Sequence, residues 1–322
     1  MKAMVLAAGL GTRMRPLTRG RAKAALPVLN RPLIHWTLER LAAAGVTDVV
    51  INLHHRPATL RRAVGDGSAF GLRVAYSYER RILGTGGGPR RVRDVFGGDP
   101  FLLVNGDVIF DFDLASLVRR HLEAGAQATL ALLPNPRPRR YTPIVVGRGA
   151  RIRSIGGRPV AARGAASLFT GVHVLDPALL DRLPAGVSDS IRDLYLPMIE
   201  AGERVLGVRV RGAWYDLGRP WLYLTSQVEM LASVVPGAGP RRSLVHPGAR
   251  VASGARVSGS VLGDRAVVGE GAIVEGSVLW AGARVGPGAR VADSILDGSA
   301  RLGRGQTVRR RIVMGRRRFE MK

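Results

Sequence analysis

The chain has 322 residues, enough for one large or two ordinary domains with a sizeable hydrophobic core. It contains no cysteine, which excludes disulfides, thiolate metal sites and a cysteine nucleophile, and no run of about 18 apolar residues predicts a transmembrane helix. The formal net charge is +25, yet the arginines are scattered and aromatic residues are only 5% of the chain, so we expect neither a nucleic-acid nor a membrane partner. The N-terminal stretch lacks the length and cleavage site of a signal peptide, which predicts a cytoplasmic protein.

The first half of the chain alternates strand patterns with helix patterns, joined by short links. Short apolar runs predict buried strands, and these lie at residues 3–8, 48–53, 72–78 and 100–107. Helical patterns lie at residues 30–45, which open with an asparagine cap, at 58–64, and at 88–96 despite an early proline. This alternation indicates an α/β fold with a doubly wound, mainly parallel sheet, which binds ligands at the carboxyl ends of its strands. The turn after the first strand and Asp107 both belong to that edge.

Beyond a Pro/Gly-rich linker at residues 234–242, the sequence repeats with a period of six. The repeated aliphatic residues form three series, separated by short slips: Val245, Val251 and Val257; Val261, Val267, Ile273, Leu279, Val285 and Val291; Leu296, Leu302 and Val308. A period of six fits neither a helix nor a flat strand and is typical of a parallel β-helix, in which the aliphatic residue of each hexapeptide points inward. We therefore predict two domains, residues 1–235 and residues 242–314, the second a left-handed β-helix.

A glycine-rich loop, LAAGLGTRMRPLT (6–18), follows the first strand. It matches neither the dinucleotide-binding GxGxxG pattern nor a Walker P-loop. Gly9 and Gly11 would let backbone N–H groups approach phosphate oxygens, and Arg13 would add a cationic fork of donors. The following segment holds Lys23, the only lysine between Lys2 and Lys322 in a chain that otherwise uses arginine.

Five segments resemble, in this order, the sugar-1-phosphate nucleotidyltransferases: LAAGLGTRMRPLT, AKAALPVLNRPLI, ILGTGGG (82–88), VNGD (104–107) and WYDLG (214–218). The resemblance covers about residues 1–230. The hexapeptide tail fits members that carry a β-helix, such as mannose-1-phosphate guanylyltransferases and glucose-1-phosphate adenylyltransferases. The resemblance implies that a sugar 1-phosphate attacks the α-phosphorus of an NTP and that pyrophosphate leaves. Catalysis would come from alignment and charge neutralisation, without a covalent enzyme intermediate.

The resemblance also assigns roles to individual residues. Arg13 and Lys23 are the catalytic cations, and the compact ammonium of Lys23 suits a crowded phosphate better than a planar guanidinium. The implied nucleotide-binding residues are Leu6, Ala8, Gly9, Gly11, Thr12, Glu79, Gly84 and Thr85. The implied sugar-phosphate-binding residues are Asn105, Arg158 and Gly171. Asp107 and Asp216 match two carboxylates that hold Mg²⁺, which prefers hard oxygen ligands.

The substrates are less sharply indicated than the reaction. Guanine offers two adjacent donors that the carboxylate of Glu79 could accept together, which favours GTP and a sugar 1-phosphate like that of mannose. N-acetylmuramate-1-phosphate uridylyltransferases look similar over this segment, so a uridylyltransferase for an N-acetylated sugar 1-phosphate stays open. Three motifs depart from the family pattern, at residues 22–24, 157–159 and 218–220. The second departure replaces the common EKP, so a non-catalytic homologue that binds nucleotide sugars also stays open.

The hexapeptide region suggests two further roles. Hexapeptide acyltransferases use a histidine among the coils, but only His246 lies there, at the first coil, which disfavours that activity. We expect instead that the β-helix mediates homo-oligomerisation or carries regulation.

Overall fold

The structure is a computed structural model that describes residues 1–135, 137–159, 164–234 and 242–321. The chain forms two compact units. The first consists of Met1–Leu10 and Ile34–Trp214, and the second of Gly11–Leu33 and Tyr215–Lys322. Most of the expected linker, and the predicted end of the first domain at residue 235, lie outside the described residues.

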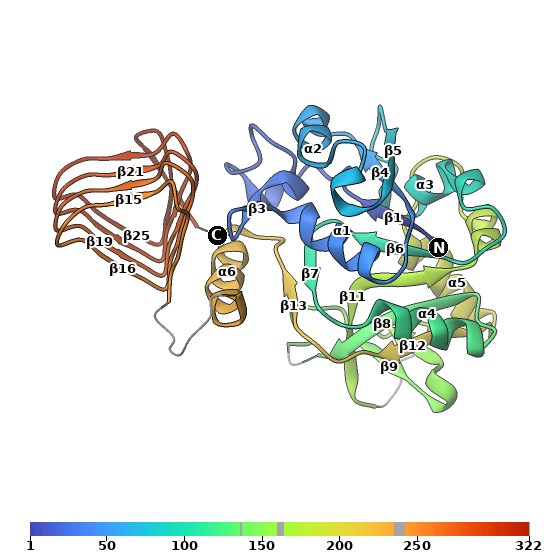
Figure 1. Ribbon diagram of the computed structural model, residues 1–322. Helices are drawn as coiled ribbons and strands as arrows, with labels where there is room; N and C mark the ends of the chain where they lie inside the picture. The colour runs from blue at the N-terminus through green and yellow to red at the C-terminus, as the bar shows by residue number, and fades with distance from the viewer. Residues whose placement is uncertain (136, 160–163, 235–241, 322) are drawn as a thin grey trace. The chain divides into compact units, whose positions relative to one another are not determined.

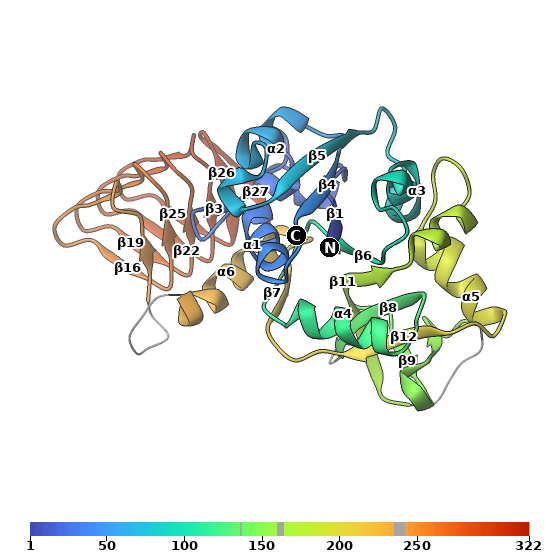
Figure 2. The same ribbon diagram turned by 45° about the vertical axis from the view of Figure 1, so that its right-hand side comes forward.

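The first unit is built on a mixed β-sheet (Figure 1). Its strands run, in spatial order, β10 (Ile152–Ile155), β9 (Ile144–Val146), β11 (Ala166–Leu175), β6 (Phe101–Asn105), β1 (Lys2–Leu6), β4 (Asp48–Leu53) and β5 (Arg73–Tyr78). Two further strands extend it from β11: β8 (Ala128–Pro134) and β12 (Val205–Arg209). The four strands β6, β1, β4 and β5 are parallel, as the strand–helix alternation predicts, whereas β11 runs antiparallel to β6 and β8. Figure 2 shows β5 beside β4 at the outer edge of the parallel half.

Helices connect and cover these strands. They are α1 (Leu33–Ala43), α2 (Pro57–Val64), α3 (Gly84–Arg91), α4 (Leu114–Glu123) and α5 (Leu196–Glu200). The short strand β7 (Val108–Phe110) follows β6, and β13 (Trp214–Asp216) lies where the first unit ends. The sheet and helices enclose a core of buried apolar side chains that includes Met4, Phe101, Leu103 and Tyr195.

Two expected helices begin elsewhere. The helix expected from Asn30 begins at Leu33, because Leu29 and Asn30 form a left-handed turn, with φ of 49° and 66°, between β2 (Pro27–Val28) and β3 (Arg31–Pro32). The helix expected over 88–96 begins at Gly84 and takes in the glycine run. In both cases packing overrides the local signal from Asn30 or from Pro89.

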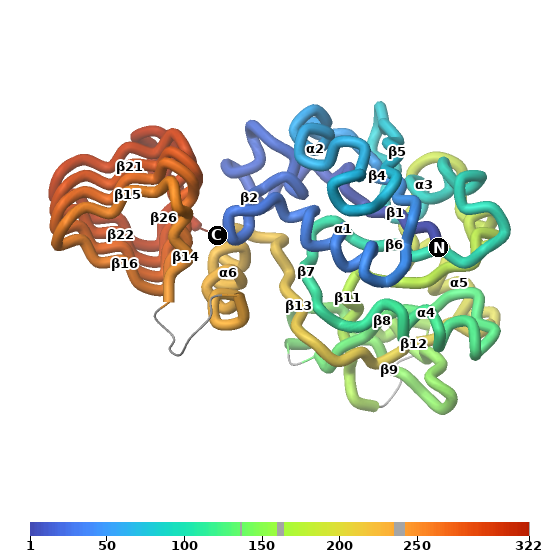
Figure 3. Tube along the Cα trace, viewed as in Figure 1, coloured from blue at the N-terminus to red at the C-terminus, as the bar shows by residue number. Residues whose placement is uncertain are grey.

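The second unit contains the predicted parallel β-helix, whose coils are drawn as a tube in Figure 3. Its first sheet contains β14 (Leu244–Val245), β17 (Val261–Leu262), β20 (Val278–Leu279), β23 (Ile295–Leu296), β26 (Arg311–Met314) and β27 (Arg317–Glu320). The second contains β15 (Arg250–Val251), β18 (Val267–Val268), β21 (Arg284–Val285) and β24 (Arg301–Leu302). The third contains β16 (Arg256–Ser258), β19 (Ile273–Glu275), β22 (Arg290–Ala292) and β25 (Thr307–Arg309). All pairs are parallel except the final hairpin of β26 and β27, so the predicted fold class is confirmed.

Each coil of the β-helix is one residue shorter than three hexapeptides. Ser260 and Ser277 occupy equivalent positions 17 residues apart, and the Ser277 N–H donates to the Ser260 hydroxyl. One of the three steps between inward residues in each coil is therefore five residues instead of six. The prediction was wrong for three members of the long series: the core contains Leu262, Val268 and Val274 instead of Val261, Val267 and Ile273.

The second unit also contains the segment that precedes α1. That segment carries two short 3₁₀ turns, Thr12–Met14 and Lys23–Ala25, and then the β2–β3 hairpin. The helix α6 (Pro220–Val234) leads toward the first coil. Across the described ranges, no helix combines the length and the apolar character needed to cross a bilayer.

Candidate functional site

The glycine turn and Lys23 are neighbours within the second unit. Gly11 has a left-handed backbone, with φ of 60°, and its carbonyl accepts a hydrogen bond of 2.8 Å from the Thr18 hydroxyl. A Cβ atom added to Gly11 would lie 2.9 Å from Thr18 Cγ2 and 3.4 Å from Lys23 Cβ. Glycine is therefore needed at position 11 for its conformation and for this close approach. The segment folds back so that Lys23, half-buried, starts its 3₁₀ turn beside the glycine.

A second glycine brings Arg13 and Asp216 together. The Gly218 N–H donates a hydrogen bond of 2.7 Å to Asp216 Oδ1. A Cβ atom added to Gly218 would lie 2.7 Å from that oxygen and 3.7 Å from Arg13 Nη2. A guanidinium and a carboxylate from distant parts of the sequence thus meet at one glycine. Arg13 and the neighbouring Thr12 are exposed, whereas Asp216 is half-buried.

In the first unit, the turn after β1 is fixed by a buried asparagine that the sequence analysis did not identify. Asn52 Oδ1 accepts hydrogen bonds from the N–H groups of Ala7 and Ala8, at 2.6 and 3.2 Å. Its amide nitrogen donates to Glu79 Oε1 at 2.8 Å. A polar residue inside the apolar run VVINL (49–53) was the available signal. Leu6 precedes this turn, and its carbonyl accepts the Gly106 N–H at 2.9 Å.

Glu79 links this turn to the glycine run. Its second oxygen accepts the Leu83 N–H at 2.8 Å, and the residue is 1% exposed. Both carboxyl oxygens thus have protein partners, and a buried polar group of this kind needs such hydrogen bonds. This arrangement gives Glu79 a structural task in holding two loops. The role of Glu79 in recognising guanine stays a prediction. The two oxygens that were expected to accept hydrogen bonds from guanine already accept them from Asn52 and Leu83.

The glycine run packs backbone to backbone against residues 183–190. Gly84 has φ of +80°, and the Gly86 N–H donates to the Ser188 carbonyl at 2.9 Å. A Cβ atom at Gly87 would collide with the carbonyl oxygen of Gly186. Thr85 donates its hydroxyl to Asp189 Oδ2 at 3.1 Å. The run therefore forms a closely packed N-terminal turn of α3. Gly9, in the loop after β1, is exposed.

Two of the three residues implied in sugar-phosphate binding touch each other. Gly171 has φ of 82°, and a Cβ atom there would lie 2.7 Å from Asn105 Nδ2. Asn105 ends β6, and Asp107 follows it by two residues and is half-buried. Arg158 is not grouped with them: it is exposed, and its guanidinium lies 3.9 Å from the carboxylate of Glu200.

The chemistry of the two aspartates suits Mg²⁺. Two carboxylates completed by substrate phosphates are a usual magnesium site, and the Gly218 N–H orients the carboxylate of Asp216. The described part of the chain holds no cluster of three or more His, Cys, Asp or Glu residues that could bind a metal by itself. Asp107 belongs to the first unit and Asp216 to the second, so a metal held by both stays a prediction.

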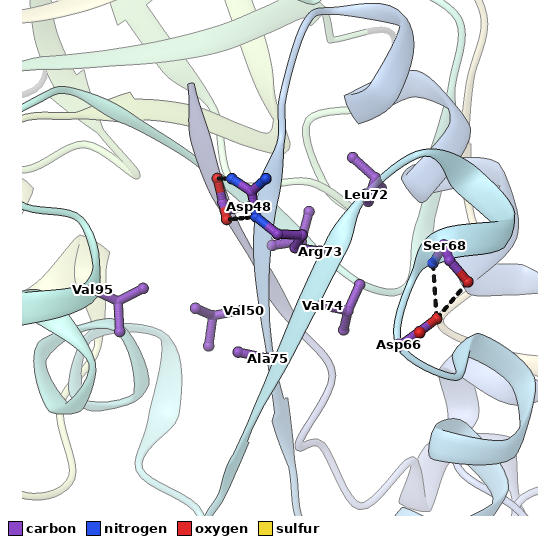
Figure 4. A pocket seen from close by; sticks show the side chains of 10 residues that line it. Asp48, Val50, Asp66, Ser68, Leu72, Arg73, Val74, Ala75 and Val95 are labelled. Atoms are coloured by element: carbon purple, nitrogen blue, oxygen red, sulfur yellow. Dashed lines mark hydrogen bonds and ion pairs between the residues drawn. The ribbon is translucent and has the colours of Figure 1, made fainter.

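A groove of about 420 Å³ on β4 and β5 has a different character (Figure 4). Asp48 and Arg73 form a two-pronged ion pair at its rim, with both N–O distances 2.7 Å, and Val50, Val74 and Val95 line it. The hydrogen bond from Arg73 lowers the pKa of Asp48. None of the predicted site residues lines this groove, so we do not count it as part of the candidate site.

A mixed sheet with a parallel half and a glycine-rich turn after its first strand, followed by a hexapeptide β-helix, defines a nucleotidyltransferase with an appended coil domain. The chain belongs to the nucleotidyl transferase family, whose model matches residues 2–233. The model of the GlmU-like C-terminal hexapeptide region matches residues 231–322. The resemblance noted from the sequence motifs is thereby confirmed.

Similar proteins share the class but differ in substrate. Mannose-1-phosphate guanylyltransferase of Mycobacterium tuberculosis is 31% identical over 259 residues, which are 79% of this chain and 72% of that protein. N-acetylmuramate alpha-1-phosphate uridylyltransferase of Neisseria meningitidis is 38% identical over 221 residues, 68% of this chain and 93% of that protein. A crystal structure assigned as a glucose-1-phosphate thymidylyltransferase from Bacillus anthracis has a TM-score of 0.63 and 22% identity, covering 74% of this chain and 98% of its own. That likeness supports the fold alone.

Proposed function

We propose that this sugar-1-phosphate nucleotidyltransferase transfers a guanylyl group from GTP to the 1-phosphate of mannose or a similar hexose. The observation that carries the transfer chemistry is the grouping, in one compact unit, of the Gly11 turn with Lys23 and of Arg13 with Asp216. Cationic groups and an acid at a glycine-rich turn suit a triphosphate accompanied by a divalent metal.

In the proposed reaction, a phosphate oxygen of the sugar 1-phosphate forms a bond to the α-phosphorus of the NTP. The bond from that phosphorus to the bridging oxygen breaks, and pyrophosphate leaves with its electron pair. Lys23 and Arg13 neutralise the charge on the phosphates, which is the main catalytic requirement of phosphoryl transfer. Asp107 and Asp216 are the proposed holders of Mg²⁺, which would supply further charge neutralisation when bound.

A uridylyltransferase acting on an N-acetylated sugar 1-phosphate is the second candidate. Two observations favour it: the 38% identity to the Neisseria meningitidis uridylyltransferase over nearly its whole length, and the two protein partners of Glu79. The first candidate keeps the support of the longer alignment, which is 259 residues with the mannose-1-phosphate guanylyltransferase against 221 with the uridylyltransferase.

A matrix of the four NTPs against several sugar 1-phosphates, with Mg²⁺, distinguishes the candidates by release of pyrophosphate. Fastest turnover of GTP with mannose 1-phosphate supports the proposal, and fastest turnover of UTP with an N-acetylated sugar supports the second candidate. Binding of nucleotide sugars without turnover of any pair would assign the chain to a non-catalytic role.

Lys23→Ala tests the transfer chemistry itself. Loss of one cation aimed at the reacting phosphates should lower kcat by about 100-fold, with the melting temperature unchanged. Lys2→Ala is the matched control, because the Lys2 ammonium bonds the Val95 carbonyl at 2.7 Å and has no proposed role in turnover. An undiminished rate in Lys23→Ala would remove this lysine from the mechanism.

A further inference from the structure

The second unit ties the lysine-bearing segment to the β-helix through one tryptophan. We propose that Trp280, directly after β20, and Tyr223 of α6 are positioning residues that set the place of Lys23 for nucleotidyl transfer. The β-helix then takes part in turnover by supporting this segment. This inference rests on the function proposed above.

A buried chain of hydrogen bonds leads from the coil to the segment. The indole Nε1 of Trp280 donates to the Tyr223 hydroxyl at 3.0 Å, and that hydroxyl donates to the carbonyl of Pro27. Trp280 is 5% exposed and Tyr223 fully buried, so water cannot easily replace either bond. Burial raises the pKa of Tyr223, which keeps the hydroxyl protonated as a donor.

The same indole also holds the segment on the other side of Lys23. The guanidinium carbon of Arg21 lies 4.9 Å from the centroid of the Trp280 ring, in a cation–π contact. Arg21 precedes Lys23 by two residues, and Pro27 follows it by four. Between them, the Leu26 N–H donates to the Lys23 carbonyl at 3.0 Å and closes the 3₁₀ turn. Trp280 thus anchors both flanks of the turn that presents Lys23.

The hairpin beyond Pro27 depends on the same two elements. Leu29 and Asn30 both have positive φ, a conformation that asparagine tolerates but that is unfavourable for leucine and persists there where neighbours enforce it. Gln227 of α6 accepts the Leu29 N–H at 3.0 Å. The Asn30 amide donates to the Leu262 carbonyl in the β-helix at 2.9 Å. The shape of the segment is therefore imposed from outside, by α6 and by the coil.

These contacts predict a kinetic effect as well as a structural one. The anchors reach the segment through one carbonyl, one backbone N–H, one side-chain amide and one guanidinium, so their loss should shift the segment without opening the cores of the units. A displacement of about 1 Å in a catalytic group can cost up to about 100-fold in rate. The expected consequence is a lower kcat, with little change in KM for the sugar 1-phosphate.

Tyr223→Phe and Trp280→Phe test the proposal, because each removes a donor and keeps an aromatic ring. Tyr76→Phe is the matched control: its hydroxyl also bonds a backbone carbonyl, that of Gly65, in the first unit. Hydrogen exchange at the amides of Ala25 and Leu26 reports the state of the segment, and pyrophosphate release reports turnover. Both variants should exchange faster at these amides and lose about tenfold in kcat, and Tyr76→Phe should change neither.

A double-mutant cycle separates positioning of Lys23 from a general loss of stability. Adding Tyr223→Phe to Lys23→Ala should cause no further fall in kcat, because the group that it positions is already gone. Unchanged amide exchange, unchanged kcat despite faster exchange, or additive losses in the double variant would each overturn the proposal. If the wild-type protein turns over no substrate pair, the proposed function fails, and unchanged nucleotide-binding affinity in Tyr223→Phe would then overturn the positioning role as well.

Discussion

His173 of β11 is a titratable residue placed in the core of the first unit. It is 1% exposed, its Nδ1 atom is hydrogen-bonded to the Tyr195 hydroxyl, and the ring of Phe169 packs edge-on against it. Burial away from water lowers the pKa of His173 to about 3. The imidazole is therefore neutral in the folded protein at physiological pH.

This histidine predicts a loss of stability in mild acid. The unfolded chain takes up a proton at His173 below a pH of about 6.5, and the folded protein does so only near pH 3. Its contribution to the free energy of unfolding is complete above pH 6.5 and should fall progressively between these values. Urea unfolding at pH 7, 6 and 5 measures it. His173→Asn should show a shallower decline than the wild type, and parallel curves would contradict the assignment.

For single residues, the sequence identified the candidate catalytic side chains better than it identified the buried hydrogen bonds. Lys23 was conspicuous as the single internal lysine, and it lies beside Gly11, while its catalytic role stays a prediction. Asn52 and Glu79 are less conspicuous, because their partners, which are each other and the N–H groups of distant loops, are brought near only by folding. The residue type indicates which groups a side chain can bond to. The fold decides which of those groups are close enough to be its partners.

Among the elements, the start of α3 shows why a run of glycines can be structural. Gly86 and Gly87 press against Ser188 and Gly186, and Gly88 lies against the Asn52–Glu79 pair, where added side-chain atoms would meet close neighbours. Glycine is normally unfavourable inside a helix, so tertiary packing explains its presence here better than helix propensity.

Gly87→Ala tests this packing. The new Cβ would collide with the Gly186 carbonyl oxygen, and the backbone shift needed to relieve it should cost about 1–3 kcal/mol of stability. Thermal unfolding measures the loss. Gly98→Ala is the control, because no atom lies within 4 Å of a Cβ at that exposed position. Equal melting temperatures for the two variants would contradict the packing explanation.

For the molecule as a whole, the division into units places the glycine-rich segment with the β-helix. Residues 11–33 belong to the second unit, although their motifs belong with the first half of the sequence. The predicted boundaries at 235 and 242 stay predictions, as do homo-oligomerisation, a cytoplasmic location and the absence of a nucleic-acid partner.

Removal of the β-helix tests which of two roles it has: support of the lysine-bearing segment, or oligomerisation. A chain that ends at Val234 loses Trp280, the Leu262 carbonyl and Phe319, whose ring lies 5.5 Å from the guanidinium carbon of Arg19. We expect kcat to fall by at least about tenfold, because the lysine-bearing segment is no longer anchored. Pyrophosphate release and light scattering measure activity and mass. A truncated monomer with full activity per chain would restrict the β-helix to assembly.

The sequence by itself determined the class of the protein, the parallel half of the sheet and the presence of the coil. These follow from local periodicity and from motifs whose residues are close together in the chain. It did not determine the 17-residue coil, the left-handed turn at Leu29 and Asn30, or the buried partners of Glu79. Only the tertiary structure decided these features, because each depends on atoms from distant segments, whose excluded volume and hydrogen bonds override local preference.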